Sequence, residues 1–198
     1  MDLKGKKVIL ASNSPRRREL LAGLNIEFEV DTRSNFKEYF EPDVPHPQVP
    51  ALMSEGKSTG FHRPLEEGEI LITSDTMVLL DGLIMGKPHS REEAVQMLKT
   101  LSGRTHEVIT AVTVRDSAHY ETVTDSTQVH FRELSDEEIT YYIDTFKPYD
   151  KAGAYGIQEW IGYAAITGIE GSFYNVMGFP VHKVYEELIK FANYGTER

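Results

Sequence analysis

The organisation of this chain follows from residues 8–21, which read VILASNSPRRRELL. The first four residues are apolar and predict a short buried strand. Ser14 then stands where a helix N-cap is favoured, and Pro15 suits the first helical position. Leu20 and Leu21 begin an apolar helix face. The chain is therefore expected to pass from a strand, through a turn, into a helix whose first turn carries arginines.

The helix start predicted at Ser14 is suited to bind an anion. Its free backbone N–H groups and the positive end of the helix dipole favour negative charge. Arg16, Arg17 and Arg18 add positive charge at the same place. The alternative is a solvated helix face. Because the formal net charge of the chain is -10, three adjacent arginines favour a phosphate-binding site.

Length and composition narrow the class of protein. At 198 residues, 40% of them hydrophobic, the chain suits one domain with a sizeable core, arranged as two lobes around a cleft. No apolar run approaches the ~20 residues of a membrane helix, and the first residues do not match a signal peptide. The sequence contains no cysteine, which excludes disulfides and thiolate chemistry and suits a cytoplasmic protein. The negative net charge disfavours nucleic acid as a partner.

Predicted strands and helices are mixed along the chain without strict alternation. Strands are expected at residues 27–31, 69–74, 77–80, 83–85, 106–114, 120–131 and 163–169. Helices are expected at residues 51–61, 90–101 and 135–146, and again from residue 181 onward. This order predicts an α/β fold with a mixed, twisted sheet flanked by helices.

Asp75 is the first candidate for a catalytic acid or base. It follows a strongly apolar strand, at a strand end where side chains can enter a cleft. Ser74 and Thr76 flank it with hydroxyl groups. A carboxylate in this position can hold a divalent metal or take a proton from water. The alternative is a carboxylate that ends a strand in a turn.

Several polar residues could complete such a site. Lys57 and Lys87 could neutralise phosphates, and Lys87 is favoured because a neighbouring glycine and proline restrain its backbone. Gln158 could bind a nucleobase edge through its amide. From the residues alone, each of these, and Glu38, could equally be a solvated surface side chain. The sequence has no Walker-type loop, no histidine spacing of a zinc site and no nucleophile elbow.

Five segments together resemble the Maf family of nucleoside triphosphate pyrophosphatases. They occur in the family's order and span nearly the whole chain, which makes the resemblance specific. They are residues 12–21, 74–76 with the hairpin to 86–88, 101–103, 150–158 and 171–180. The resemblance implies a Maf/ITPase-like fold, with two lobes around a central cleft, formed by a single domain over residues 1–198 and usually assembled as a homodimer.

The resemblance also implies a reaction. Maf pyrophosphatases hydrolyse a nucleoside triphosphate to the monophosphate and pyrophosphate with a divalent cation, Mg²⁺ or Mn²⁺. The implied substrates are dTTP and UTP, with modified pyrimidine nucleotides as further candidates, in a house-cleaning role. One alternative is a pyrophosphatase for another nucleotide, such as 7-methyl-GTP. The other is a non-catalytic nucleotide-binding regulator of septum formation.

Residue roles follow from the same resemblance. Asp75 matches the catalytic acid/base position. Glu38 and Asp75 match the positions that bind the metal. Phosphate-contacting positions are matched by Ser12, Arg16, Arg17, Lys57 and Lys87. The trio that marks the dTTP/UTP-preferring branch is matched by Arg16, Thr76 and Gln158.

The chain departs from the family pattern in three places. Lys37 precedes Glu38 where relatives often have a second acid. The segment around Lys57 carries Gly56, Ser58 and Gly60 where relatives are richer in alanine. After Gln158 the chain reads Glu-Trp-Ile-Gly, at residues 159–162, in place of a more glycine-rich run.

Overall fold

The computed structural model describes residues 2–194, and these form two compact units. Unit 1 contains the chain up to Asp75, then Thr110–Asp125, and the chain from Gly178 onward. Unit 2 contains Thr76–Ile109 and Ser126–Met177. The expected single domain over residues 1–198 also includes residues 1 and 195–198, which lie outside the described part. Within residues 2–194, the helices lack the length and the apolar character that a membrane span requires.

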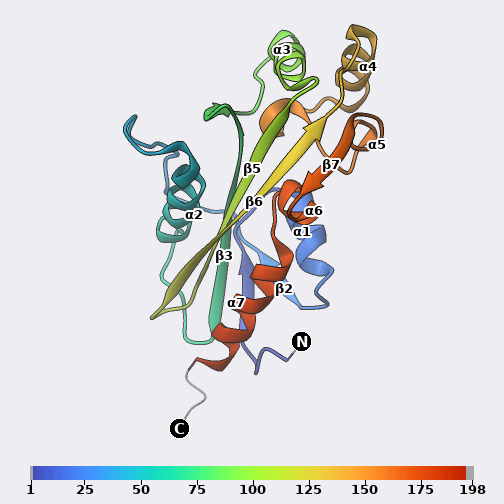
Figure 1. Cartoon of the computed structure of the whole chain (residues 1–198). Helices are drawn as coiled ribbons and strands as arrows, with labels where there is room; N and C mark the ends of the chain where they lie inside the picture. Colours follow the sequence, from blue (N-terminus) through green and yellow to red (C-terminus); the bar gives the residue numbers. More distant parts are fainter. Residues whose placement is uncertain (1, 195–198) are drawn as a thin grey trace. The chain divides into compact units, whose positions relative to one another are not determined.

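The strands form a mixed sheet, as the sequence predicts (Figure 1). The strand order is β2-β1-β3-β5-β6-β7, with β4 paired to β3. β1 runs parallel to β2 and β3, whereas β4 is antiparallel to β3 and β7 to β6. The strands are β1 (Lys7–Leu10), β2 (Phe28–Val30), β3 (Glu69–Leu80), β4 (Leu83–Met85), β5 (Thr105–Arg115), β6 (Tyr120–Phe131) and β7 (Ile166–Glu170).

Helices flank the strands of both units (Figure 1). Unit 1 has α1 (Pro15–Ala22), α2 (Val49–Thr59), α7 (Val181–Asn193) and the 3-10 turn His46–Gln48. Unit 2 has α3 (Arg91–Leu101), α4 (Asp136–Phe146), α5 (Trp160–Ala165), α6 (Phe173–Val176) and the 3-10 turn Ala152–Ala154. The expected capping box is present at the start of α4, where Ser135 and Glu138 each bind the other's backbone N–H.

The predicted strand-to-helix passage at residues 8–21 is confirmed. Val8, Ile9 and Leu10 are buried, and β1 is an inner strand of the sheet, paired with β2 and β3. Ser14 is the N-cap of α1, and its side-chain oxygen accepts a hydrogen bond from the backbone N–H of Arg17 at 3.4 Å. α1 therefore begins immediately after β1.

Two sequence predictions are wrong in detail. The expected break between residues 74 and 77 is absent, since β3 runs from Glu69 to Leu80 and Asp75 lies inside it. The charged residue in this part of the strand is paired, because Lys57 Nζ lies 2.6 Å from Asp75 Oδ1. The strand expected at 163–169 begins only at Ile166, because residues 160–165 form α5.

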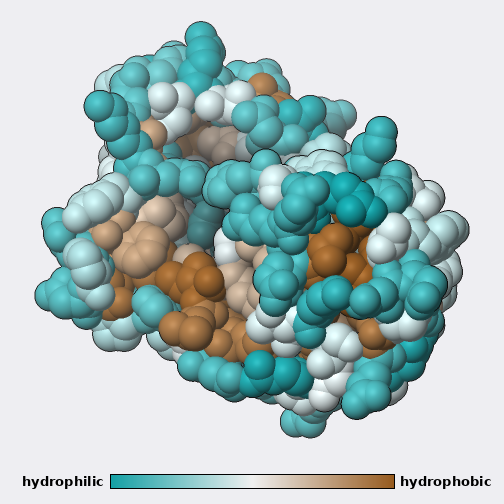
Figure 2. All heavy atoms as spheres, turned by 90° about the horizontal axis from the view of Figure 1, so that it is seen from above, coloured by the Kyte–Doolittle hydropathy of each residue, from teal (hydrophilic) through white to brown (hydrophobic). Residues whose placement is uncertain are grey.

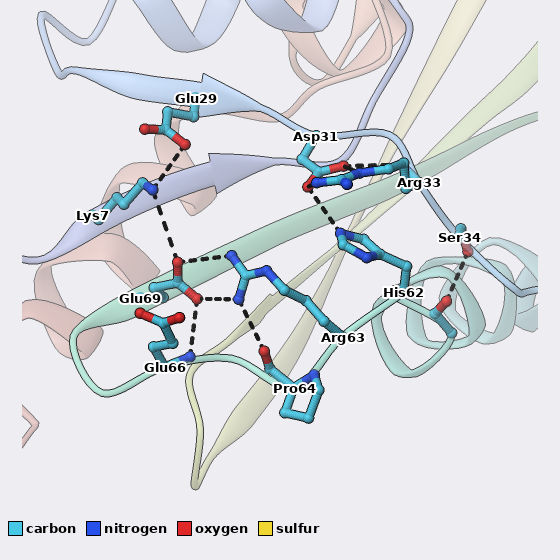
Figure 3. A network of polar contacts seen from close by, with 11 residues as sticks. Lys7, Glu29, Asp31, Arg33, Ser34, His62, Arg63, Pro64, Glu66 and Glu69 are labelled. Atoms are coloured by element: carbon cyan, nitrogen blue, oxygen red, sulfur yellow. Dashed lines mark hydrogen bonds and ion pairs between the residues drawn. The ribbon is translucent and has the colours of Figure 1, made fainter.

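Within unit 1, a network of charged side chains joins segments that precede and follow α2 in the sequence (Figure 3). Asp31 accepts hydrogen bonds from Arg33, at 2.9 and 2.6 Å, and lies 3.0 Å from His62 Nε2. The hydrogen bonds from Arg33 hold the pKa of the Asp31 carboxyl well below its usual range. Burial raises this pKa in part, and the contact with His62 lowers it further. Arg63 makes two hydrogen bonds to Glu69, at 2.6 and 2.8 Å. The network thus holds residues 31–33 against the segment that follows α2.

Three aromatic rings pack edge to face in unit 2. His106 lies 5.1 Å from Phe131 and 5.3 Å from Tyr155, measured between ring centroids. His106 Nε2 is 2.6 Å from the Tyr155 hydroxyl oxygen. The His106 residue is only 2% exposed, and burial lowers its pKa from 6.5 to about 4. The imidazole is therefore neutral in the folded protein at neutral pH.

This buried imidazole predicts a loss of stability in mild acid. Between pH 6.5 and about 4 the unfolded chain binds a proton at His106 that the folded chain does not. The free energy of unfolding is expected to fall by about 2 kcal/mol from pH 7 to pH 5 through this group. Urea unfolding of the wild type and of His106→Gln at both pH values measures this contribution. Equal pH dependence in the two proteins would contradict it.

Candidate functional site

The start of α1 presents the first group of predicted site residues. Ser12 is buried, and its hydroxyl oxygen accepts a hydrogen bond from the backbone N–H of Ser14 at 3.2 Å. Arg16 lies half-buried in the first turn of the helix. The hydrogen bond between Ser12 and Ser14 thus stabilises the turn between β1 and α1. The helix start that it fixes has the positive character that favours an anion.

The Arg17 side chain is held by two backbone carbonyls from different parts of unit 1. Its Nε donates to the Gly178 carbonyl and its Nη1 to the Ser74 carbonyl, each at 2.9 Å. Burial lowers the pKa of Arg17 to about 10, a shift that the nearby Asp75 carboxylate opposes. The guanidinium therefore stays charged at neutral pH. Beyond its expected contact with phosphate, Arg17 fixes the residue immediately before Asp75.

Lys57 brings two predicted carboxylates together. Its ammonium nitrogen lies 2.6 Å from Asp75 Oδ1 and 2.9 Å from Glu38 Oε1. Lys57 stands in the last turn of α2, and Asp75 in the middle of β3. Asp75 and Lys57 are mostly buried, whereas Glu38 is exposed. One cation is thus shared by two carboxylates that are 37 residues apart in sequence.

The structure explains why a glycine stands at position 56, next to Lys57. A Cβ atom at Gly56 would lie 2.2 Å from the Phe36 ring, so only glycine leaves room for this side chain on α2. The Gly60 carbonyl accepts hydrogen bonds from the Asn35 backbone at 2.8 Å and from the Ser34 hydroxyl at 3.1 Å. Phe36 is therefore docked on α2, two residues before Glu38, and this contact helps to bring Glu38 to Lys57.

The packing of Phe36 on α2 predicts opposite effects of one substitution in two backgrounds. Gly56→Ala should lower the free energy of unfolding by about 1–3 kcal/mol, because overlap with the ring outweighs the higher helix propensity of alanine. In a Phe36→Ala background the overlap is gone, and Gly56→Ala should instead stabilise by about 1 kcal/mol. Urea unfolding of the four proteins measures both values. The same sign in both backgrounds would contradict the packing.

The remaining predicted residues lie in unit 2. Thr76 follows Asp75 in β3, and Lys87 is exposed just beyond β4. The backbone N–H of Gly153 donates to the Gly86 carbonyl at 3.0 Å, so the loop of Lys87 lies beside the loop that leads to Gln158. The predicted residues thus divide into two groups at the boundary between residues 75 and 76. Unit 1 contains Ser12, Arg16, Arg17, Glu38, Lys57 and Asp75, and unit 2 contains Thr76, Lys87 and Gln158.

A metal ion would have two protein carboxylates available in unit 1. No group of three or more His, Cys, Asp or Glu side chains within residues 2–194 could hold a metal ion by itself. However, Asp75 and Glu38 already converge on one cation, the Lys57 ammonium. Mg²⁺ is commonly bound by one or two carboxylates together with substrate phosphates. These residues therefore fit a divalent metal that binds jointly with a phosphorylated substrate.

Sequence reasoning missed Phe36, whose ring packs on α2 at Gly56. Phe36 stands in a stretch without a clear hydrophobic period, so no local pattern distinguishes it.

Comparisons with known proteins identify the family of this chain. The model of the Maf-like protein family matches residues 7–191. The dTTP/UTP pyrophosphatase of Porphyromonas gingivalis is 48% identical over 193 residues, covering 96% of this chain and 97% of the relative. The enzyme of the same name from Phocaeicola vulgatus is 48% identical over 189 residues, covering 96% and 98%. The solved structure of a HAM1 protein from Coxiella burnetii has a TM-score of 0.41 and 13% identity, covering 64% of this chain and 73% of that one. The chain belongs to the Maf family.

Proposed function

We propose that this protein is a nucleoside triphosphate pyrophosphatase that hydrolyses dTTP and UTP to the monophosphate and pyrophosphate. The observation that carries the proposal is the name shared by relatives that are 48% identical over 96% of this chain. The arrangement of Asp75, Glu38 and Lys57 supports it, because a triphosphate needs both positive charge and a proton acceptor near its α-phosphorus.

In the proposed reaction a water oxygen attacks the α-phosphorus, and the bond to the oxygen bridging to the β-phosphorus breaks. Asp75 orients the water and takes its proton. The start of α1, with Ser12, Arg16 and Arg17, binds the phosphates. Lys57 and Lys87 neutralise charge on the departing pyrophosphate. When bound by Asp75 and Glu38, Mg²⁺ or Mn²⁺ supplies Lewis-acid polarisation of the phosphate.

Base selection is assigned to Arg16, Thr76 and Gln158. Uracil and thymine present two carbonyl oxygens on the pairing edge, and the NH₂ group of Gln158 can donate to such a carbonyl. Cytosine reverses part of this pattern, because it has an amino group in place of one carbonyl. A glutamine amide can therefore contribute to discrimination between these bases.

We further propose that the protein works as a homodimer in the cytoplasm. Several large apolar or aromatic side chains are exposed, among them Leu83 and Tyr163. Figure 2 shows apolar patches within a mainly hydrophilic face. Exposed apolar patches are typical of association surfaces. Sedimentation equilibrium of the purified protein tests the dimer, and a monomer at micromolar concentration would reject it.

A panel of nucleoside triphosphates tests the proposed function directly. Pyrophosphate release is measured with dTTP, UTP, dCTP, ATP, GTP and 7-methyl-GTP, with Mg²⁺ or Mn²⁺ and with EDTA. The proposal expects the fastest release from dTTP and UTP, and none with EDTA. Fastest release from 7-methyl-GTP would favour the alternative pyrophosphatase. Tight binding of triphosphates without product would favour the regulator of septum formation.

A further inference from the structure

The loop that carries Gln158 is held by a buried ion pair. The Lys151 ammonium lies 2.7 Å from Asp150 Oδ1 and 3.2 Å from Glu159 Oε1. The Lys151 side chain is only 10% exposed, and Glu159 is largely buried. Lys151 and Glu159 stand at opposite ends of the loop, so their contact closes it on itself. An ion pair so little exposed to water is screened weakly and holds its geometry well.

A tyrosine from α4 completes this arrangement. Tyr142 is fully buried, and its hydroxyl accepts a hydrogen bond from the Gly156 backbone N–H at 3.0 Å. The same hydroxyl donates to Glu159 Oε2. Burial and the Glu159 carboxylate raise the pKa of Tyr142, so the hydroxyl keeps the proton that it donates. Tyr142 thus joins the middle of the loop to the residue that follows Gln158.

Gln158 is packed on the same group of atoms. A Cβ atom built on Gly156 would lie 3.0 Å from Lys151 Cε, 3.1 Å from Glu159 Cδ and 3.2 Å from Gln158 Oε1. The three side chains therefore converge on one glycine. Gln158 Oε1 is buried and has no hydrogen-bond partner within residues 2–194. The orientation of the Gln158 amide is consequently set by packing on Gly156, Lys151 and Glu159.

We propose that Glu159, together with Tyr142 and Lys151, positions the Gln158 amide and thereby helps to set base selectivity. The inference rests on the proposed function. Glu159 and Tyr142 are positioning residues, since they act through Gln158 and the loop backbone. Loss of the ion pair or of the tyrosine hydroxyl leaves the amide free to rotate. An amide that can present either its oxygen or its NH₂ group accepts cytosine as readily as uracil or thymine.

The test compares Glu159→Gln and Tyr142→Phe with the wild type. Both changes nearly preserve side-chain volume. Glu159→Gln removes the charge that pairs with Lys151, and Tyr142→Phe removes the hydroxyl that binds Gly156. The measured quantity is the ratio of kcat/KM for dTTP to kcat/KM for dCTP. Each variant should lower this ratio about tenfold, mainly through a higher KM for dTTP. Exchange of the Gly156 amide hydrogen should be faster in Tyr142→Phe.

Glu138→Gln is the matched control, because it also breaks an ion pair of unit 2, with Arg132 at 2.7 Å. It should leave both the ratio and the Gly156 exchange rate unchanged. If the wild type hydrolyses dTTP but Glu159→Gln leaves the dTTP/dCTP ratio unchanged, the inference is overturned and the proposed function stands. This holds even if the Gly156 amide hydrogen exchanges faster. No pyrophosphate release by the wild type would reject the proposed function, and the inference with it.

Discussion

Asp75→Asn is expected to lower kcat for dTTP by about 10²–10⁴-fold, the usual contribution of a general base. Asparagine has the size and shape of aspartate, and its side-chain oxygen can still accept the hydrogen bond from Lys57 that Asp75 Oδ1 now accepts at 2.6 Å. The fold and the position of Lys57 should therefore persist. What disappears is the carboxylate that shares the Lys57 cation with Glu38 and that, in the proposed reaction, takes the proton from water. KM should change much less than kcat.

Asp81→Asn provides a matched control. Asp81 occupies the exposed hairpin turn between β3 and β4 with a φ of 51°, a conformation that asparagine also adopts readily. This change should leave pyrophosphate release within twofold or so of the wild type, as is usual for a surface substitution away from the site. Thermal unfolding of both variants checks that the chains are folded. Near wild-type turnover by a folded Asp75→Asn protein would remove Asp75 from the catalytic role.

Gly162→Ala is expected to have the largest effect on stability, lowering the free energy of unfolding by roughly 3 kcal/mol or more. A Cβ atom at Gly162 would lie 1.7 Å from the Ile157 carbonyl oxygen and 2.7 Å from its carbonyl carbon. These are backbone atoms, so they cannot rotate away as a flexible side chain could. The backbone N–H of Gly162 also donates to the Glu159 carbonyl at 2.9 Å, and this bond would be strained.

Gly168→Ala serves as the control in the same unit. Gly168 lies in β7, where a Cβ atom would meet only the His130 ring at 3.6 Å, an ordinary van der Waals distance. It should change the free energy of unfolding by less than about 1 kcal/mol. Urea denaturation of both variants gives the comparison. A similar, small effect of the two substitutions would show that the turn between Ile157 and Gly162 can shift at little cost.

The parts of the fold that the sequence predicts well are those with local determinants. The start of α1 depends on Ser14 and Pro15, which act within one turn of helix. The hairpin at 81–82 depends on an Asp-Gly pair that adopts positive φ at both positions, 51° and 76°. In contrast, the length of β3 depends on contacts from other segments, such as the ion pair between Lys57 of α2 and Asp75, which no local pattern reveals.

The same distinction applies to the candidate site. The family resemblance supplies Asp75, Glu38 and Lys57, and the structure brings these three side chains together. The resemblance does not supply the contacts that bring these side chains to their positions. The docking of Phe36 on Gly56 joins residues that are distant in sequence, and the glycine alone predicts a weak helix rather than a packing site. Such support depends on the complementary shapes of two segments, which become visible only in the folded chain.

The two hydrogen bonds of Arg17 have a consequence for synthesis on the ribosome. Unit 1 is assembled from three separate stretches of the chain, and Arg17 joins two of them by binding the carbonyls of Ser74 and Gly178. Residue 178 leaves the exit tunnel only after the whole of unit 2 has left it. Domains whose segments are contiguous can fold while the remainder is still being made. Unit 1 cannot, so the nascent polypeptide should remain unable to cleave nucleotides until α7 has emerged.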